Sequence, residues 1–344
     1  MTELGGRHAP FALMNRILVT GATGFLGGAV ARRLAADGQH VVATGRRVEA
    51  GAALEASGIR FVAADVADAA AIRALVAGSD AVVHCAALAA PWGPYAAFHR
   101  ANVGGTAAVA EACLARGARL VHVSTPSIYF HLDDRVDVRE GDALPLVPVN
   151  PYAATKLLAE AVVQALVRAG LDAVVLRPRA IYGEGDRTVF PRLVRALTAR
   201  RLPVVGDGLN VSSLSYVGNV VDAITTCLGA PAPFVGQAYN VADAKPVVLW
   251  RTIGTLCRRL GLPAPPRHVP VGRLLRVAGW VEAFHRRFRP GVEPTLTRYG
   301  VAVLGRSQTI STEAIRRDLG WAPRVGADEG MERFAAWWER EGRR

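Results

Sequence analysis

Short apolar runs alternate with longer amphipathic stretches over the first half of the chain. Runs rich in Val, Ile and Leu between turn residues are typical of buried strands, whereas apolar residues at helical spacing indicate helices. Because strands that alternate with helices favour a parallel sheet covered on both faces, the pattern predicts an α/β fold with right-handed crossovers. The predicted strands are 16–20, 40–44, 60–63, 81–85, 120–124 and 173–177, and the predicted helices are 27–37, 69–77, 103–115 and 152–169.

The pattern loosens after about residue 180, where prolines become frequent. We therefore expect a Rossmann-type doubly wound parallel sheet over 15–182, and a smaller, mostly helical C-terminal lobe over 183–344 that is interleaved with the sheet. Residues 1–14 are expected to be an N-terminal extension without a signal peptide, and Met14 is an alternative start. Ligands of such sheets bind beyond the carboxyl ends of the strands.

Composition narrows the class of protein. The formal net charge of +12 comes almost entirely from arginine, since Lys156 and Lys245 are the only lysines. The basic residues are scattered rather than clustered with aromatic residues, which argues against a nucleic-acid partner. An anionic substrate, cofactor or membrane surface explains the charge as well. The four cysteines are widely spaced, a pattern that suits free thiols in a reducing cytoplasm better than disulfides or a metal site.

A glycine-rich turn follows the first predicted strand and precedes the first helix. Its glycines are spaced G-x-x-G-x-x-G, which lets backbone N–H groups approach a phosphate at a helix N-terminus, where the helix dipole favours an anion. This context indicates a dinucleotide site. The residues expected to contact the cofactor here are Gly21, Thr23, Gly24, Phe25, Leu26 and Gly27.

The end of the second strand bears on which cofactor is used. An acidic residue about 20 positions past the glycine turn selects the 2′-hydroxyl form. That position is Gly45, followed by Arg46 and Arg47, which predicts NADP(H) over NAD(H) because arginine can pair with the 2′-phosphate. The alternative is a pair of solvated loop arginines. Asp65 and Val66, after the third strand, are expected near the adenine ring.

Tyr152 and Lys156 are the strongest catalytic candidates. Residues four apart on a helix share one face, so a phenol and an ammonium can point into one cleft. An ammonium beside a phenol is expected to lower the pKa of the phenol, which suits acid/base chemistry near neutral pH. The alternative is a surface ion pair. Three hydroxyls at the end of the fifth predicted strand, Ser124, Thr125 and Ser127, are candidates for binding a substrate oxygen.

Together these segments resemble the ordered motif set of the extended short-chain dehydrogenases/reductases, within the NAD-dependent epimerase/dehydratase superfamily. The resemblance implies that Tyr152 is the acid/base, that Lys156 holds the nicotinamide ribose, and that Thr125, with Ser124 as the fallback, binds the substrate oxygen. It also implies homodimers through two sheet-flanking helices. The matching segments are 20–27, Arg46, Asp65, 84–87, 102–106, 124–125, 152–156 and 177–183. The implied neighbours of the nicotinamide are Cys85, Ala86, Ala87, Asn102, Pro178, Ala180 and Ile181.

The C-terminal half narrows the branch of this family. Nucleotide-sugar epimerases and dehydratases typically carry the motif R-x-[YF]-x-H-V-x-D in this half. The corresponding segment, 214–221, lacks the arginine, histidine and aspartate. It is similar instead to the Y-V-x-N-V motif of the 3β-hydroxysteroid dehydrogenase-like branch. Further segments resemble bacterial 2-alkyl-3-ketoacid reductases of olefin biosynthesis: 90–93, 98–102, 124–127 and 176–179. This resemblance implies a small hydrophobic substrate, with Trp92, Ser127 and Arg179 as candidate contacts.

A basic amphipathic segment at 269–288 also suits an apolar substrate. Its apolar residues are expected to form one face, beside several arginines. Such a helix can cover a lipid-like substrate or lie on a membrane surface. An ordinary helix packed on the core is the alternative. The apolar residues are Val271, Leu274, Leu275, Val277, Ala278, Val281, Phe284 and Phe288, and the arginines are Arg273, Arg276, Arg286, Arg287 and Arg289.

The sequence thus predicts an NADP(H)-dependent oxidoreductase that interconverts a ketone and a secondary alcohol on a hydrophobic 3-ketoacid, steroid-like or lipid-like substrate. Two alternatives stay open. A nucleotide-sugar epimerase or reductase would use Arg179, Arg192 and Arg195 for a sugar diphosphonucleotide. A non-catalytic NAD(P)-binding regulatory protein is the other, although it has no need of the Tyr152–Lys156 pair.

Overall fold

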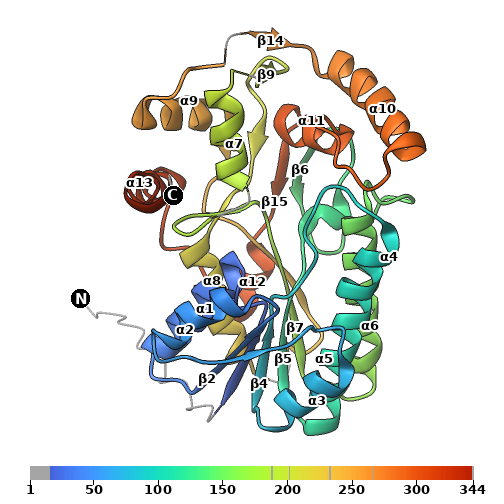
Figure 1. Cartoon of the computed structure of the whole chain (residues 1–344), viewed down its shortest axis with the longest axis vertical. Coiled ribbons are helices and arrows are strands. Elements are labelled where there is room, and N and C mark those ends of the chain that lie inside the picture. The colour runs from blue at the N-terminus through green and yellow to red at the C-terminus, as the bar shows by residue number, and fades with distance from the viewer. Residues whose placement is uncertain (1–15, 187–188, 201, 232–233, 266, 343–344) are drawn as a thin grey trace.

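A seven-stranded, wholly parallel sheet forms the centre of the molecule (Figure 1). The computed structural model describes residues 16–186, 189–200, 202–231, 234–265 and 267–342, so the predicted extension at 1–14 lies outside the described residues. The strand order is β12-β7-β5-β4-β1-β2-β3. The strands are β1 (Ile17–Thr20), β2 (Val41–Gly45), β3 (Arg60–Ala63), β4 (Ala81–His84), β5 (Arg119–Val123), β7 (Ala173–Pro178) and β12 (Ala238–Val241).

The strand order reverses between β1 and β4, which makes this point the crevice where ligands of doubly wound sheets bind. In the register of these two strands Thr20 lies beside His84, so the glycine turn and the segment after β4 leave the sheet together. The predicted fold class, a Rossmann-type doubly wound sheet with a helical C-terminal lobe, is confirmed.

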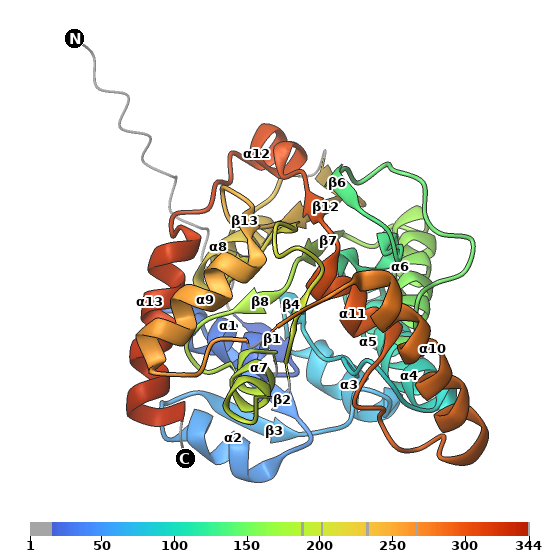
Figure 2. The same ribbon diagram turned by 90° about the horizontal axis from the view of Figure 1, so that it is seen from above.

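Helices cover both faces of the sheet because successive strand residues point to opposite sides. In β1, Ile17 and Val19 belong to the core on one face, and Leu18 belongs to the core on the other. Figure 2 shows the two helical layers from above. One layer holds α1 (Phe25–Ala36), α2 (Val48–Glu55) and α8 (Val217–Leu228), and the other holds α3 (Ala69–Ala77), α5 (Gly105–Arg116) and α6 (Pro151–Arg168).

The C-terminal half forms a lobe with its own small core above the sheet in Figure 1, and returns to the sheet through β12. Its helices are α7 (Val189–Thr198), α9 (Leu249–Leu260), α10 (Val271–Phe288) and α11 (Arg298–Gly305), whereas α12 (Glu313–Leu319) and α13 (Ala327–Trp337) belong to the core that packs on the sheet. A four-stranded sheet joins β6 (Arg135–Val138), β10 (Val211–Ser212), β13 (Val247–Val248) and β15 (Gln308–Ile310). There are also two-stranded sheets in the described part of the chain. One pairs β8 (Ile181–Tyr182) with β11 (Ser215–Tyr216), and the other pairs β9 (Val204–Val205) with β14 (His268–Val269).

Helix α10 corrects one prediction. Ala278 is buried, and Leu274 and Leu275 pack against the core of the lobe, as one apolar face requires. Val277, Phe284 and Phe288, which were assigned to the same face, are exposed instead. At 100° per residue these three positions fall on the outer side of the helix, too far around it to reach the core.

Candidate active site

The glycine turn is fixed by close backbone approaches. Gly21 has φ +67, and a Cβ there would lie 2.7 Å from the Cα and N atoms of Ala86. A Cβ at Gly27 would lie 2.4 Å from the carbonyl oxygen of Gly21. Both positions therefore need glycine, which brings the turn after β1 against the segment after β4.

The start of α1 fits the pyrophosphate of a dinucleotide. Gly24 is the N-cap, and neither a side-chain cap nor an acidic residue occupies the first turn. The first N–H groups of a helix have no partner within the helix, and its dipole favours an anion there. A helix of 12 residues with this uncapped start, beside the close-packed turn, suits the phosphates of a nicotinamide dinucleotide.

The end of β2 is followed by basic residues, and position 45 has no room for the acidic side chain that would select a 2′-hydroxyl cofactor. A Cβ at Gly45 would lie 2.6 Å from Oγ1 of Thr23, so the threonine occupies the space that a larger residue would need. Arg46 and Arg47 follow at exposed positions. The guanidinium of Arg47 donates to the carbonyl of Thr23, which holds this arginine against the glycine turn.

Asp65 and Val66 follow the end of β3 in the sequence. Oδ1 of Asp65 accepts a hydrogen bond from the N–H of Ala67 at 3.0 Å, and Oδ2 pairs with Arg100 at 2.8 Å. Val66 is buried against Gly105, where a Cβ would meet its side chain at 2.8 Å. Contact of either residue with the adenine ring stays a prediction.

Asn102 joins the segment after β4 to α6. It lies in a π-helical turn, His99–Gly104, immediately before α5. Its Oδ1 accepts from the N–H of Leu88 at 2.7 Å, and its Nδ2 donates to Oγ1 of Thr155 at 3.0 Å. This buried amide therefore fixes the chain just beyond Cys85, Ala86 and Ala87 relative to α6.

The N-terminus of α6 positions Tyr152. The side chain of Asn150 accepts from the N–H of Ala153 at 2.8 Å, and Pro151 occupies the first helical position, where no N–H is needed. The side chain of Thr125 lies near enough to the phenol of Tyr152 to lower its pKa slightly. The structure thus brings together the predicted acid/base and the predicted substrate-oxygen donor.

The segment after β5 that carries the hydroxyls of Ser124, Thr125 and Ser127, here called the hydroxyl loop, continues toward α11. Oγ1 of Thr125 accepts from the N–H of Ser127 at 3.1 Å and caps the 3-10 helix Pro126–Tyr129. The two side-chain oxygens of Thr125 and Ser127 are also 3.1 Å apart. The hydroxyl of Ser124 is buried and has no hydrogen-bond partner among the described residues.

Lys156 is 1% exposed and is bound to β5. Its Nζ donates to the carbonyl of Val123 at 2.8 Å and lies 3.2 Å from Nε2 of His122. Burial lowers the pKa of Lys156 to about 8, because desolvation disfavours the charged form.

The expectation that Lys156 lowers the pKa of Tyr152 is wrong for this structure. Burial raises the pKa of Tyr152 to about 12, and the nearby side chain of Thr125 opposes that rise only in part. The reason is geometric: the lysine amine bonds to the backbone and imidazole of β5. Tyr152 is therefore a protonated phenol at neutral pH in the ligand-free chain.

A buried histidine pair beneath Lys156 was not predicted. The rings of His84 and His122 have centroids 5.3 Å apart. Burial and the Lys156 charge lower the pKa of both, that of His84 to about 3, so both rings are neutral. Because the lysine donates to Nε2 of His122, this ring carries its proton on Nδ1, which has no partner among the described residues.

His84 is held from both sides. Its Nδ1 lies 2.7 Å from Oγ1 of Thr20, and its Nε2 lies 3.1 Å from Oγ1 of Thr106. A polar residue inside an otherwise apolar buried strand is the signal that reveals such a pair, since His122 interrupts the apolar run of β5.

Tyr299 reaches the site from α11 and was also missed. Its hydroxyl lies 3.2 Å from Oγ of Ser127, and its ring packs on Phe130 with centroids 4.8 Å apart. Thr297 caps the start of α11, which is visible in the sequence. Nothing in the sequence pattern indicates that this helix end returns to the loop after β5.

Arg179 is buried without an acidic partner among the described residues. One Nη donates to Oε1 of Gln308 at 2.6 Å, and Nε has no partner. Burial lowers the pKa of this guanidinium. It lines a small cavity with Phe130, in the 3-10 region that leads back to the hydroxyl loop.

The remaining predicted residues lie around this centre. Trp92 donates from its indole to the carbonyl of Pro290 at 3.1 Å, beyond the end of α10, and the guanidinium of Arg286 lies 5.9 Å from the centroid of its ring. Pro178 ends β7 and Ile181 begins β8. Between them Ala180 has φ +45, a left-handed conformation that costs a non-glycine residue about 1–3 kcal/mol and is characteristic of functional segments.

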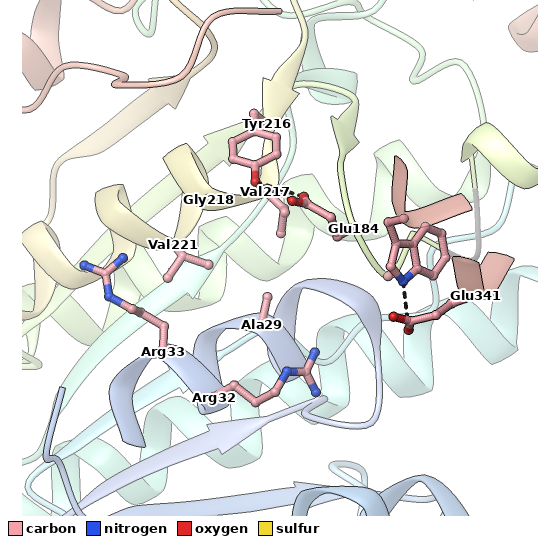
Figure 3. Close-up of a pocket in the computed structure, with 11 residues that line it drawn as sticks. Ala29, Arg32, Arg33, Glu184, Tyr216, Val217, Gly218, Val221 and Glu341 are labelled. Carbon is pink, nitrogen blue, oxygen red and sulfur yellow. Dashed lines mark hydrogen bonds between the residues drawn. The ribbon is translucent and has the colours of Figure 1, made fainter. Parts of the chain in front are cut away.

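A cavity of ≈ 550 Å³ lies elsewhere, between α1, α8 and the C-terminal residues (Figure 3). Thr125, Tyr152 and Lys156 do not line it. The hydroxyl of Tyr216 donates to Glu184 at 2.9 Å, and the indole of Trp337 donates to Glu341 at 3.2 Å. These internal pairs satisfy its carboxylates, so we place the candidate chemistry at the strand ends.

Comparison with known proteins agrees with this geometry. Residues 17–242 match the NAD dependent epimerase/dehydratase family. The chain is 37% identical over 327 residues to the 2-alkyl-3-oxoalkanoate reductase of Stenotrophomonas maltophilia (strain K279a), covering 93% of this chain and 98% of that one. It is 30% identical over 299 residues to 3beta-hydroxysteroid-dehydrogenase/decarboxylase isoform 1 of Arabidopsis thaliana, covering 82% and 67%.

Solved structures show the same fold. The dTDP-glucose 4,6-dehydratase DesIV from Streptomyces venezuelae, with NAD and TYD bound, has a TM-score of 0.74 and 26% identity, covering 95% of this chain and 97% of that one. The chain belongs to the NAD dependent epimerase/dehydratase family. It is an NAD(P)-dependent oxidoreductase of the extended short-chain dehydrogenase/reductase type, in the 3β-hydroxysteroid dehydrogenase-like branch that its motifs predicted.

Proposed function

We propose that this chain is an NADP(H)-dependent reductase that interconverts a ketone and a secondary alcohol on a hydrophobic substrate of the 3-oxo acid, steroid-like or lipid-like class. The observation that carries the proposal is that Tyr152 and the buried amine of Lys156 lie one turn apart on α6, next to the segment that carries Thr125. The names of the two relatives support the substrate class. The four free cysteines support a reducing compartment such as the cytoplasm.

The proposed division of labour follows from these contacts. When bound, the nicotinamide cofactor supplies the hydride that reduces the carbonyl carbon. Thr125 donates to the carbonyl oxygen, and Tyr152 gives that oxygen its proton, since its pKa of about 12 keeps the phenol protonated at neutral pH. Ser124, with its buried and unpartnered hydroxyl, is the fallback donor.

Lys156 sustains the supply of protons. With a pKa of about 8 it is close enough to neutral pH to gain and lose a proton readily. Val123 and His122 engage two of its three N–H donors, so the third is available to a ribose hydroxyl or to Tyr152.

The preference for the 2′-phosphorylated cofactor rests on the end of β2. Gly45 supplies no carboxylate, and Arg46 and Arg47 are exposed beside the glycine turn. A guanidinium can bind a phosphate through two parallel hydrogen bonds. The same residues would leave a 2′-hydroxyl without an acidic acceptor.

Arg179 supports a substrate that carries an anionic group. A buried guanidinium without a carboxylate partner is costly, and an incoming carboxylate removes that cost. Tyr299 links the two regions, because its hydroxyl lies 3.2 Å from Oγ of Ser127 and its ring packs on Phe130, which lines the same cavity as Arg179. A 3-oxo acid presents the ketone and the carboxylate within one small molecule.

The test is a fluorescence titration with NADPH and NADH of the wild type, Arg46→Ala, and Arg73→Ala as the matched exposed arginine on α3. We expect NADPH to bind more tightly, and Arg46→Ala to lose about 10–100-fold in NADPH affinity with NADH unchanged. Equal affinities, or an equal loss in Arg73→Ala, contradict the cofactor assignment.

The substrate is tested separately, by NADPH consumption with a 2-alkyl-3-oxo acid and a 3-oxosteroid, and by chromatography for the conversion of UDP-glucose to another nucleotide sugar. Turnover of the oxo compounds alone supports the proposal. Conversion of UDP-glucose alone would favour the nucleotide-sugar alternative. Tight NADPH binding without turnover of any of these compounds would favour a regulatory protein.

A further inference from the structure

Helix α10 exposes an apolar surface that nothing in the chain covers among the described residues. Trp280 is 80% exposed, Phe288 64%, Phe284 52% and Val277 43%. Their spacing places all four on the outer half of the helix, opposite the buried Ala278. Figures 1 and 2 both show α10 at the edge of the molecule.

The same outer half is uniformly basic. Its charged residues are the exposed arginines at 273, 276, 286 and 287. Glu282, the one acidic residue of α10, is buried, and its carboxylate accepts from the backbone N–H of Arg298 at 2.7 Å, from Nε of Arg298 at 3.0 Å and from Arg286 at 3.4 Å. The other three arginines have no acidic partner among the described residues, so the exposed face of α10 combines a tryptophan, two phenylalanines and net positive charge.

We propose that α10 docks the enzyme on the surface of an anionic lipid bilayer. A helix with exposed Trp and Phe beside Arg lies in the interfacial plane, where apolar side chains enter the headgroup boundary and arginines meet anionic lipid. A second copy of this chain fits less well, because pairing the face with itself brings arginines against arginines. No helix in the described part of the chain is long and apolar enough to cross a membrane, so the contact is peripheral.

The inner side of α10 connects this surface to the active site. Arg298, which Glu282 holds, precedes Tyr299, whose hydroxyl contacts Ser127. At the other end, Trp92 donates to Pro290 just past α10. Docking would thus present the substrate lobe to a source of hydrophobic molecules. That consequence rests on the proposed function, whereas the docking itself does not.

The experiment is flotation of the full chain with vesicles of phosphatidylcholine alone, and with vesicles containing about one third phosphatidylglycerol. We expect binding to the anionic vesicles that weakens as salt is raised. Trp280→Ser/Phe284→Ser should reduce the bound fraction at least tenfold, and Trp280→Phe should preserve it. All of these side chains are exposed, so an unchanged melting temperature is expected and shows that the fold is intact.

The charge is tested with Arg273→Ala/Arg276→Ala against Arg73→Ala/Arg168→Ala, which removes two exposed arginines from other helices. Each arginine on α10 should contribute about fivefold in binding, the equivalent of about 1 kcal/mol, and the control pair almost nothing. Equal losses in the two double variants would overturn the proposal, as would equal binding to neutral vesicles.

Two further outcomes are decisive. Absence of binding to anionic vesicles overturns the docking surface, whatever the enzyme reduces. A dimer in sedimentation velocity that Trp280→Ser/Phe284→Ser converts to a monomer, without vesicle binding, would assign the face to a second copy. Vesicle binding without any ketone reduction would leave docking standing and remove the proposed function.

Discussion

On the proposed cofactor side of the site, His84, His122 and Lys156 are 1% exposed or less, and each contacts the next. On the substrate side, α10 leaves Trp280 80% exposed and is attached through Glu282 to the start of α11. The first region is a buried, preorganised polar cluster on the central strands β4 and β5 and helix α6, where desolvation determines which groups are charged. The second is a surface helix. Changes in the first should therefore affect the chemical step, and changes in the second should affect which molecules arrive.

The largest expected effect tests the cofactor side directly. Tyr152→Phe removes the proposed proton donor and should lower kcat by about 10²–10⁴-fold, while NADPH affinity stays within about twofold. Steady-state kinetics and fluorescence titration measure the two quantities. Undiminished turnover would show that Tyr152 is not the acid/base.

A substitution in the glycine turn tests whether the close backbone approach at Gly21 is needed for stability and cofactor binding. Gly21→Ala introduces both a left-handed alanine and a Cβ 2.7 Å from Ala86, so we expect a loss of at least ~3 kcal/mol in the free energy of unfolding, with loss of NADPH binding. Gly38→Ala is the matched control: it has φ +81 with nothing within 4 Å, and should cost about 1–2 kcal/mol. Denaturant unfolding compares them, and equal losses would mean that the close approach relaxes freely.

The substrate side predicts a different kinetic signature. Arg179→Met should raise KM for a 3-oxo acid by about 10–100-fold, with little effect on a ketone of equal length without a carboxylate. Arg192→Met is the control, since this exposed arginine pairs with Glu293 at 3.2 Å away from Tyr152. A similar rise for both ketones would make Arg179 a structural residue.

The smallest effect concerns stability and pH. The pKa of Lys156 is about 8 in the folded chain and 10.5 ordinarily, so between these values the unfolded chain binds more protons. Stability of the wild type relative to Lys156→Met should therefore rise with pH across this window, by at most about 1.4 kcal/mol per pH unit. Unfolding titrations at pH 8.5 and 9.5 measure the difference, and a fall with pH would refute the assigned burial cost.

The sequence predicted the sheet well because most of its strands are buried on both faces, so each appears in the sequence as a continuous apolar run. The predicted helix at 69–77 coincides with α3, and its N-cap, Asp68, accepts from the N–H groups of Ala70 and Ala71. Tyr152 and Lys156 were found because their spacing within one helix is a local property.

What sequence reasoning missed depends on contacts between distant segments. The hydrogen bond between Tyr299 and Ser127 spans 172 positions, and no periodicity encodes it. The pKa of Tyr152 was predicted in the wrong direction because spacing shows that Lys156 is near but not that its amine bonds to Val123. The outer apolar residues of α10 were assigned to the same face as Ala278, Leu274 and Leu275 because hydrophobicity alone does not tell which side of a helix meets the core.

The contact between Gly45 and Thr23 limits how this enzyme can change during evolution. A Cβ at position 45 would lie 2.6 Å from Oγ1 of Thr23, so an acidic residue that selects the 2′-hydroxyl cofactor cannot enter by one substitution without a clash. An acidic residue at position 45 therefore needs a change at Thr23 as well, so the two positions are expected to change together.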